Sequence, residues 1–178
     1  MNAPQREDDE PVTVQPYDPV WPARFENERC LLQRVLGEFI TGGIHHVGST
    51  SVPGLDAKPV IDILAGIADL DAAHPCIDLL GPLSYLYAPY RVDEILWFCK
   101  PYPARRTHHL HLVPTGSARY RAELLFRDYL REHPDARADY ARIKHDLAVR
   151  YRYDREAYTK GKTAFVQEIL RRASGLVG

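Results

Sequence analysis

The sequence predicts an α+β fold, a small mixed sheet flanked by helices and followed by a helical C-terminal region. The β-branched, apolar run from 60 to 67 is typical of a central strand buried on both faces. Residues 94–99 and 107–113 have the composition of two further strands, joined by a loop rich in proline and arginine. From Ser117 onward, apolar side chains recur at helical spacing. This order of elements favours a mixed sheet that packs against helices.

The first element is predicted to be a helix that begins near Pro22, because proline is tolerated in the first helical turn. Five apolar residues define its buried stripe: Phe25, Leu32, Val35, Leu36 and Phe39. Gly42 and Gly43 are expected to end it.

Residues 44–47 are predicted to form a short strand that ends at Gly48. After the central strand, a helix is expected from 69 to 80, with Pro75 in its early turns. Three residues are placed as N-caps of the C-terminal helices: Ser117, Asp135 and Asp154.

The length of 178 residues fits one domain. Residues 1–11 are predicted to be a disordered acidic tail, and residues 12–178 to be the domain. No apolar run approaches the roughly 18 residues that span a bilayer, and the N-terminus does not resemble a signal peptide, so we expect a cytoplasmic protein. Cys30, Cys76 and Cys99 are odd in number and widely spaced, which predicts reduced, packed thiols.

The net charge of −1 gives no strong signal for binding nucleic acid or a membrane. The charges are unevenly distributed, however. Residues 1–99 contain 6 Lys and Arg against 15 Asp and Glu, whereas residues 100–178 contain 17 against 9. The acidic tail and the solvated faces of basic helices explain this split most simply. A basic half that closes over an anionic ligand is the other explanation.

A candidate phosphate-binding turn follows the strand at 44–47. A strand that ends in Gly48 and Ser49 turns tightly, and it exposes backbone amides together with the hydroxyls of Ser49 and Thr50. This geometry suits phosphate oxygens. A Gly-Ser pair alone is nevertheless an ordinary turn, so the interpretation depends on neighbouring residues.

Asp62 interrupts the apolar central strand. A buried carboxylate costs free energy unless it is paired, hydrogen-bonded or bound to a metal, so Asp62 needs a partner. Lys58, a histidine or a divalent cation could serve. Alternation along the strand at 107–113 places His109 and His111 on one face, where two imidazoles suit a metal or a phosphate. The alternatives are a structural histidine pair and a salt bridge from Asp62 to Lys58 or to a lysine of the C-terminal region.

Three further cations are candidate ligand contacts. Lys144 and Lys162 fall on the apolar stripes of adjacent helices. Their stems could pass apolar neighbours to reach solvent, or their ammonium groups could meet a buried anion. Arg127 could contact a phosphate, or it could form an ion pair with Asp128 or with a residue in the neighbourhood of Asp135.

These segments together resemble the GrpB family, a branch of the nucleotidyltransferase superfamily. The resemblance covers roughly residues 12–172. It rests on YDPVWPARFENE, HVGSTSVPGLDAKPVIDIL, THHLHLV and FRDYLREHPDARADY, with Lys144 and Lys162 after them. It implies a nucleotidyltransferase-like fold over nearly the whole chain.

The superfamily pattern implies a Gly-Ser turn that holds a nucleotide triphosphate, and carboxylates at alternate positions of the next strand that bind two metal ions. Gly48 and Ser49 match the turn, and Asp62 matches the first carboxylate. The second position falls on Leu64, which cannot bind a metal, so the two-metal site is incomplete.

The third carboxylate position corresponds to His109 or His111, and the sequence does not distinguish them. Asp93 and Glu94 are weaker candidates for a substitute carboxylate. The resemblance therefore implies at most one divalent cation, Mg²⁺ or another, with Asp62, His109 and His111 as both its ligands and the catalytic candidates.

Two functions follow from the resemblance. The first is a nucleotidyltransferase-like protein that binds a nucleotide or a phosphorylated small molecule, with Lys144 and Lys162 neutralising its charge. Leu64 replaces a metal-binding carboxylate, so the resemblance does not imply catalytic activity. The alternative is a non-catalytic ligand-binding or accessory module, related to the domain that is fused to dephospho-CoA kinase.

Overall fold

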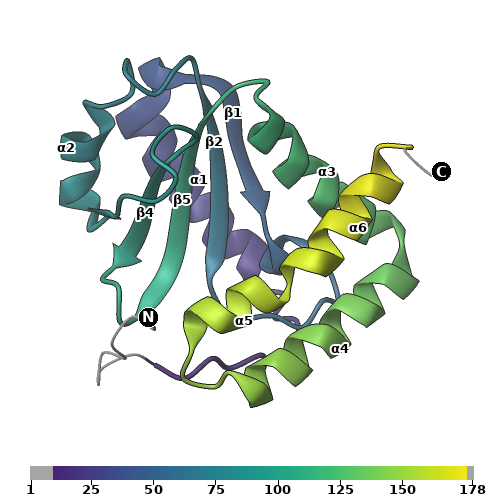
Figure 1. Cartoon of the computed structure of the whole chain (residues 1–178). Helices are drawn as coiled ribbons and strands as arrows, with labels where there is room; N and C mark the ends of the chain where they lie inside the picture. Colours follow the sequence, from purple (N-terminus) through teal and green to yellow (C-terminus); the bar gives the residue numbers. More distant parts are fainter. Residues whose placement is uncertain (1–9, 176–178) are drawn as a thin grey trace.

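Five strands form one mixed sheet in the computed structural model, which describes residues 10–175 (Figure 1). The strands are β1 (Ile40–Val47), β2 (Ile61–Ile67), β3 (Leu86–Tyr87), β4 (Leu96–Pro101) and β5 (Arg106–Pro114). Their order in the sheet is β1-β2-β5-β4-β3. β2 and β5 are parallel, and every other neighbouring pair is antiparallel. The predicted α+β fold with a small mixed sheet is confirmed.

Helices cover both faces of this sheet (Figure 1). The α-helices are α1 (Trp21–Leu36), α2 (Cys76–Leu80), α3 (Ala118–Glu132), α4 (Pro134–Arg150), α5 (Arg155–Gly161) and α6 (Thr163–Ala173). Short 3-10 turns are η1 (Gly37–Phe39), η2 (Ser49–Ser51) and η3 (Gly81–Leu83). None of the helices in residues 10–175 combines the length and hydrophobicity needed to cross a membrane.

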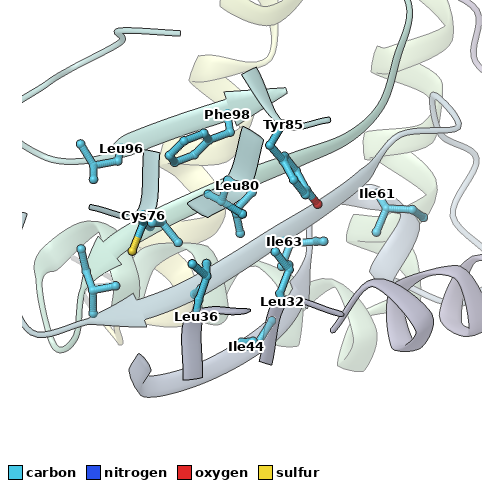
Figure 2. Close-up of a cluster of buried hydrophobic side chains, with 14 of the residues drawn as sticks. Leu32, Leu36, Ile44, Ile61, Ile63, Cys76, Leu80, Tyr85, Leu96 and Phe98 are labelled. Atoms are coloured by element: carbon cyan, nitrogen blue, oxygen red, sulfur yellow. The ribbon is translucent and has the colours of Figure 1, made fainter. Parts of the chain in front are cut away.

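The main core lies between the sheet and the helices α1 and α2 (Figure 2). Leu32 and Leu36 of α1 are fully buried against Ile63 of β2, as the predicted stripe requires. Leu110 and Leu112 of β5 join the same cluster. Because side chains alternate along a strand, His109 and His111 lie on the other face of β5, as the sequence predicted.

The second face of the sheet carries the polar candidates and packs against α3. Val47, Leu64 and Val113 form a smaller apolar cluster there, with Tyr120 and Leu124 of α3 against it. Asp62 shares this face with Leu64, because the two residues are separated by one position on β2. The tertiary structure thus places Asp62, His109 and His111 under the C-terminal helices.

The prediction that Gly42 and Gly43 end the first helix is wrong. The helix ends at Leu36, and both glycines lie inside β1. The pairing of β1 with β2 shifts register between Ile40 and Ile44, and Gly43 has a φ of +78° there. The glycines therefore serve a bulge in the strand rather than a helix terminus.

Two other boundaries differ from prediction. Only Cys76–Leu80 of the expected helix 69–80 is α-helical, because Pro75 has no N–H to donate and Asp69 accepts a hydrogen bond from the amide of Ala72 in a turn. Asp135 lies in the first turn of α4, whose N-cap is His133.

Ser117 and Asp154 are N-caps as predicted, since their side chains accept hydrogen bonds from the amides of Tyr120 and Ala157. Cys76 and Cys99 are buried free thiols, but Cys30 is exposed on α1, against the expectation that all three are packed. Most of the predicted tail, residues 1–9, lies outside the described residues.

Candidate functional site

The Gly48 turn passes directly over Asp62. β1 ends at Val47, and Gly48 adopts a φ of +68° before the 3-10 turn. A β-carbon on Gly48 would lie 2.3 Å from Oδ2 of Asp62. Only glycine therefore combines this backbone conformation with so close an approach of the turn to the carboxylate.

The hydroxyl of Thr50 is used inside the protein. It donates to the carbonyl of Val60 and forms a 2.9 Å hydrogen bond with Nε2 of His46. Burial lowers the pKa of His46 to about 4, so this imidazole is neutral at pH 7. Thr50 thus fastens the turn to the segment before β2, and its role in ligand binding stays a prediction.

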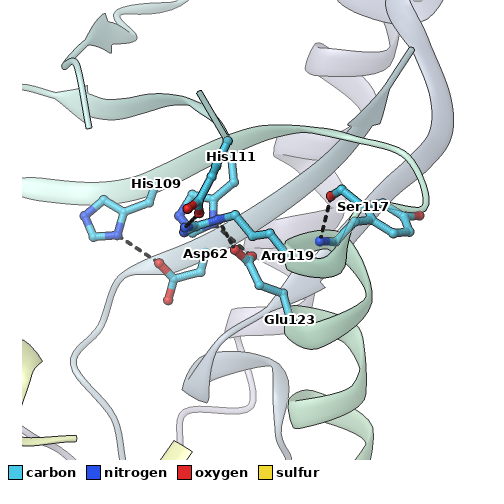
Figure 3. A network of polar contacts seen from close by, with 8 residues as sticks. Asp62, His109, His111, Ser117, Arg119 and Glu123 are labelled. Carbon is cyan, nitrogen blue, oxygen red and sulfur yellow. Dashed lines mark hydrogen bonds and ion pairs between the residues drawn. The ribbon is translucent and has the colours of Figure 1, made fainter. Parts of the chain in front are cut away.

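Asp62 and His109 form a hydrogen-bonded pair across the parallel strands β2 and β5 (Figure 3). Oδ1 of Asp62 lies 2.8 Å from Nδ1 of His109. Burial opposes ionisation of the carboxyl group, but the bond and charge of His109 hold the pKa of Asp62 below its ordinary value. Burial lowers the pKa of His109. A carboxylate accepts only, so Nδ1 is the donor and Nε2 carries the lone pair.

Nε2 of His109 is buried, and it has no hydrogen-bond partner among residues 10–175. A buried hydrogen-bond acceptor without a partner destabilises a close-packed protein interior. At the edge of a ligand site, it offers an acceptor to a bound molecule.

His111 forms a second imidazole–carboxylate pair with Glu123 of α3 (Figure 3). Nδ1 of His111 lies 2.9 Å from Oε2 of Glu123. Burial works against the charged imidazole, but Glu123 raises the pKa of His111 above its ordinary value. Nε of Arg119 donates to the other oxygen of Glu123 at 3.0 Å. In the sheet, His111 is the register partner of Leu64.

Two lysines approach the same region from different segments. Lys58 precedes β2, and Lys162 joins α5 to α6. Their ammonium nitrogens lie 5.9 Å and 4.6 Å from the centroid of the Tyr158 ring. In the described part of the chain, neither ammonium forms a hydrogen bond or an ion pair.

Burial lowers the pKa of both lysines, and that of Lys58 falls to about 8. The negative charge of Asp62 acts in the opposite direction and favours the charged form of each lysine. The alternative of a direct ion pair between Asp62 and Lys58 is not seen; the carboxylate binds His109 instead.

The structure gives Lys144 and Arg127 internal partners. Nζ of Lys144 donates to the carbonyl of Asp56, and the side chain is buried. Arg127 binds both carboxylate oxygens of Asp128 at 2.7 and 3.0 Å, and it also donates to the carbonyl of His46. The ion-pair alternative for Arg127 is thus present, and ligand roles for both residues stay predictions.

The substitute carboxylates do not join Asp62. Glu94 lies at the surface, 3.4 Å from Arg119 and 3.5 Å from Arg91, and Asp93 is exposed. Arg119 contacts both Glu94 and Glu123, so Glu94 lies at the exposed end of the network that contains His111 and Glu123.

The superfamily's two-metal site does not fit these residues. Leu64 is 0% exposed and occupies the second carboxylate position. Asp62 and His111 each bind a separate partner, and no group of three or more metal-binding side chains converges within residues 10–175. The described residues therefore lack the ligands for a pair of metal ions.

Sequence reasoning missed Glu123 and Tyr158. Arg119, Glu123 and Arg127 recur every four residues along α3, so they form one charged stripe. Glu123 binds His111 of β5, and Arg127 donates to the carbonyl of His46 in β1. The charged stripe beside the apolar residues of α3 was the sequence signal that could have identified Glu123. The helical spacing around Tyr158 indicated only an aromatic residue of the core.

The structure defines a mixed α/β protein in which a Gly-Ser turn lies over a strand carboxylate. The family model described as GrpB protein matches residues 11–172. The chain belongs to the GrpB family.

Individual relatives agree with this assignment. A UPF0157 protein of Pseudomonas aeruginosa is 46% identical, with 93% of this chain and 69% of that protein aligned. The glutamate-rich protein GrpB of Alkalihalophilus pseudofirmus is 34% identical over 84% of this chain and 88% of its own length. The crystal structure of the conserved protein GrpB from Enterococcus faecalis superposes with a TM-score of 0.83 at 31% identity, covering 92% and 98% of the two chains.

A further relative is a dephospho-CoA kinase of Mycolicibacterium paratuberculosis, which is 30% identical over 92% of this chain. The alignment covers 46% of that kinase.

Proposed function

We propose that the chain binds a nucleotide or another phosphorylated small molecule beside the Gly48–Ser49 turn, with the phosphate between Lys58 and Lys162. One observation carries this proposal. Two partly buried lysines, Lys58 and Lys162, approach the same Tyr158 ring and interact electrostatically with Asp62, and that carboxylate already binds His109.

The charge balance of the site favours an anionic ligand. Burial is the main cause that lowers the pKa of Lys58, and the positive charge of Lys162 is among the further causes. A phosphate would supply the missing negative charge, and its hydrogen bonds to ammonium groups are roughly twice as strong as those between neutral groups. The hydroxyl of Ser49 and the amides of Ser49 and Thr50 would supply further donors, whereas the amides of Ser51 and Val52 already donate to the carbonyls of Gly48 and Ser49.

Asp62 and His109 give this site the elements of transfer chemistry. Asp62 is held ionised, and Nε2 of His109 is an acceptor within the protein interior. A group of this kind accepts the proton of an attacking hydroxyl in acid–base catalysis. Nucleotidyl or phosphoryl transfer is therefore the reaction class to assay.

A non-catalytic accessory module is the second candidate. Leu64 removes the second carboxylate of the superfamily pattern, and a dephospho-CoA kinase contains a region similar to this chain within a longer protein. In this case the site binds a phosphorylated ligand without turnover and acts through a partner.

Calorimetric titration of ATP, GTP, CTP and UTP, with Mg²⁺ or Mn²⁺ and with neither, tests the binding site. We expect Lys162→Met to weaken binding roughly tenfold or more, because a charge-assisted contact is lost while the apolar stem is kept. The matched control is Lys160→Met, two positions earlier at the end of α5, whose side chain is 75% exposed and paired with Glu156.

Lys162→Met removes a charge that burial disfavours, so the variant should be at least as stable as the wild type. A folded Lys162→Met variant that binds nucleotides as tightly as the wild type contradicts the proposed site. Absence of a heat signal at millimolar concentrations for all four nucleotides removes the nucleotide as ligand. Ligand binding without turnover, together with a captured partner, favours the accessory module.

One divalent cation at Asp62 is a separate prediction. If the carboxylate binds Mg²⁺ or a similar ion, the ion raises the melting temperature of the wild type but not that of Asp62→Ala. Asp139→Ala is the control, since Asp139 forms an exposed pair with Arg142. Equal metal-induced shifts in Asp62→Ala and the wild type would remove Asp62 from any cation site.

A further inference from the structure

A cavity of about 660 Å³ lies between α3, α6 and the loop that precedes β4. Its volume is within the range of roughly 300–1,000 Å³ that is typical of binding sites for small molecules. Phe126 of α3 and Val166 and Leu170 of α6 supply an apolar wall, and charged side chains of α3 and of the loop line the rest. Asp62 is not among the described residues that line the cavity, so the cavity is distinct from the proposed phosphate site.

The apolar wall is not used by the protein core. Val166 and Leu170 lie one helical turn apart on α6, so they are on the same side of that helix. Both are half-buried, and neither belongs to a hydrophobic core cluster of the described residues. The ring of Phe126 is held by an edge-to-face contact with Tyr140, with the ring centroids 5.4 Å apart. An apolar molecule in the cavity would remove these side chains from water, and the hydrophobic effect favours that burial.

The arginines of the lining already face carboxylates. Nε of Arg119 donates to Oε1 of Glu123 at 3.0 Å, and Nη1 of Arg119 donates to Oε2 of Glu94 at 3.4 Å. Nη1 of Arg91 lies 3.5 Å from the same oxygen of Glu94. Oε2 of Glu123 is also occupied, because it accepts a hydrogen bond from Nδ1 of His111. These charges compensate one another within the protein.

Asp93 is the remaining charged side chain of the lining. It is exposed at the edge of the cavity, and its carboxylate forms no hydrogen bond or ion pair with any other residue from 10 to 175. The turn that carries Asp93 is ordered, since the amides of Glu94 and Ile95 both donate to the carbonyl of Arg91. A positively charged group could therefore bind this carboxylate without displacing an existing ion pair.

We propose that this cavity binds a primary amine that carries a compact apolar or aromatic body, a ligand that the proposed function does not require. The ammonium group lies at Asp93, where a hydrogen bond between two charged groups favours it. The body lies against Phe126, Val166 and Leu170. An anionic ligand of the same shape is disfavoured, because it would meet the carboxylate of Asp93.

Three probes with the same aromatic body test the preference for positive charge: 2-phenylethylamine, 2-phenylethanol and 3-phenylpropionate. Titrations followed by NMR at pH 7 and constant ionic strength give their dissociation constants. We expect the amine to bind roughly fivefold more tightly than the alcohol, and the carboxylate to bind least tightly. Asp93→Asn should weaken amine binding roughly fivefold and change alcohol binding less than about twofold.

Ala122→Leu tests the apolar part of the cavity. Ala122 is half-buried in the lining on α3, and leucine is a good helix former, so the variant should fold. The larger side chain should weaken binding of the amine and of the alcohol alike, roughly tenfold. Asp78→Asn is the control for the loss of charge, because Asp78 is exposed on α2. This control and Lys162→Met should both bind the amine as tightly as the wild type does.

Three results would overturn the amine site: equal affinities for the three probes, tighter binding of the carboxylate than of the amine, or no binding of any probe. An Asp93→Asn variant that keeps the wild-type affinity for the amine would overturn it as well. None of these results bears on the phosphate site, which the nucleotide titrations test separately.

Discussion

Gly48→Ala is expected to lower the free energy of unfolding by about 3 kcal/mol and to abolish ligand binding. The backbone of Gly48, at φ +68° and ψ −173°, is in a region that only glycine adopts readily, and strain there is worth roughly 1–3 kcal/mol. The added β-carbon would also meet Oδ2 of Asp62 at 2.3 Å. Either the turn or the carboxylate must move, and the site depends on both.

Gly54→Ala is the matched control for this variant. Gly54 also has a positive φ, +77°, but a β-carbon added there would have no atom within 4 Å outside its immediate chain neighbours. We expect a loss of about 1 kcal/mol from backbone strain alone. Chemical denaturation measures both variants, and equal losses would show that contact with Asp62 is not what restricts position 48.

Lys144→Met is expected to remove a large part of the pH dependence of stability between pH 7 and 9. Lys144 is 1% exposed, and burial lowers the pKa of its ammonium to about 7. Lys162 lowers it further, while Asp56 acts in the opposite direction. The ordinary value of 10.5 applies in the unfolded chain.

The sign follows from linkage. The folded state binds this proton more weakly than the unfolded state, so Lys144 destabilises the fold most at pH values below about 7. The destabilisation fades as pH rises from 7 towards 10.5. Between pH 7 and 9, the wild type should therefore gain about 2 kcal/mol relative to Lys144→Met.

Urea denaturation at several pH values measures this difference. Lys160→Met should leave the pH profile of the wild type nearly unchanged, because its ammonium is exposed. If Lys144→Met keeps the full slope, the titration of Lys144 is not its source. Ligand affinity of Lys144→Met at pH 7 also tests the predicted contact of Lys144 with the phosphate.

Much of the site was predictable because strands impose a strict alternation of side chains. The pattern of histidines and leucines in β5 predicted which face His109 and His111 share, and the structure confirms that face. The apolar run of β2 predicted that Asp62 needs a partner. It did not predict which one, since the register of β5 against β2 decides that His109 is opposite.

The helix boundaries that were predicted wrongly involve residues that are common in more than one kind of local structure. Gly42 and Gly43 suit a helix end or a strand bulge equally, and only the pairing of β1 with β2 selects the bulge. Asp69 and Pro75 both favour turns, and this preference outweighs the helical spacing around them.

The sequence by itself determined the fold class, the family, the glycine-serine turn and the two faces of the central strands, because these depend on local periodicity and on ordered motifs. The tertiary structure alone decided which charges meet: Asp62 with His109, His111 with Glu123, and Lys58 with Arg106 and Arg155. Charge–charge interactions depend on distance through space, and residues as far apart as Lys58 and Arg155 become neighbours only when the sheet and the C-terminal helices pack together.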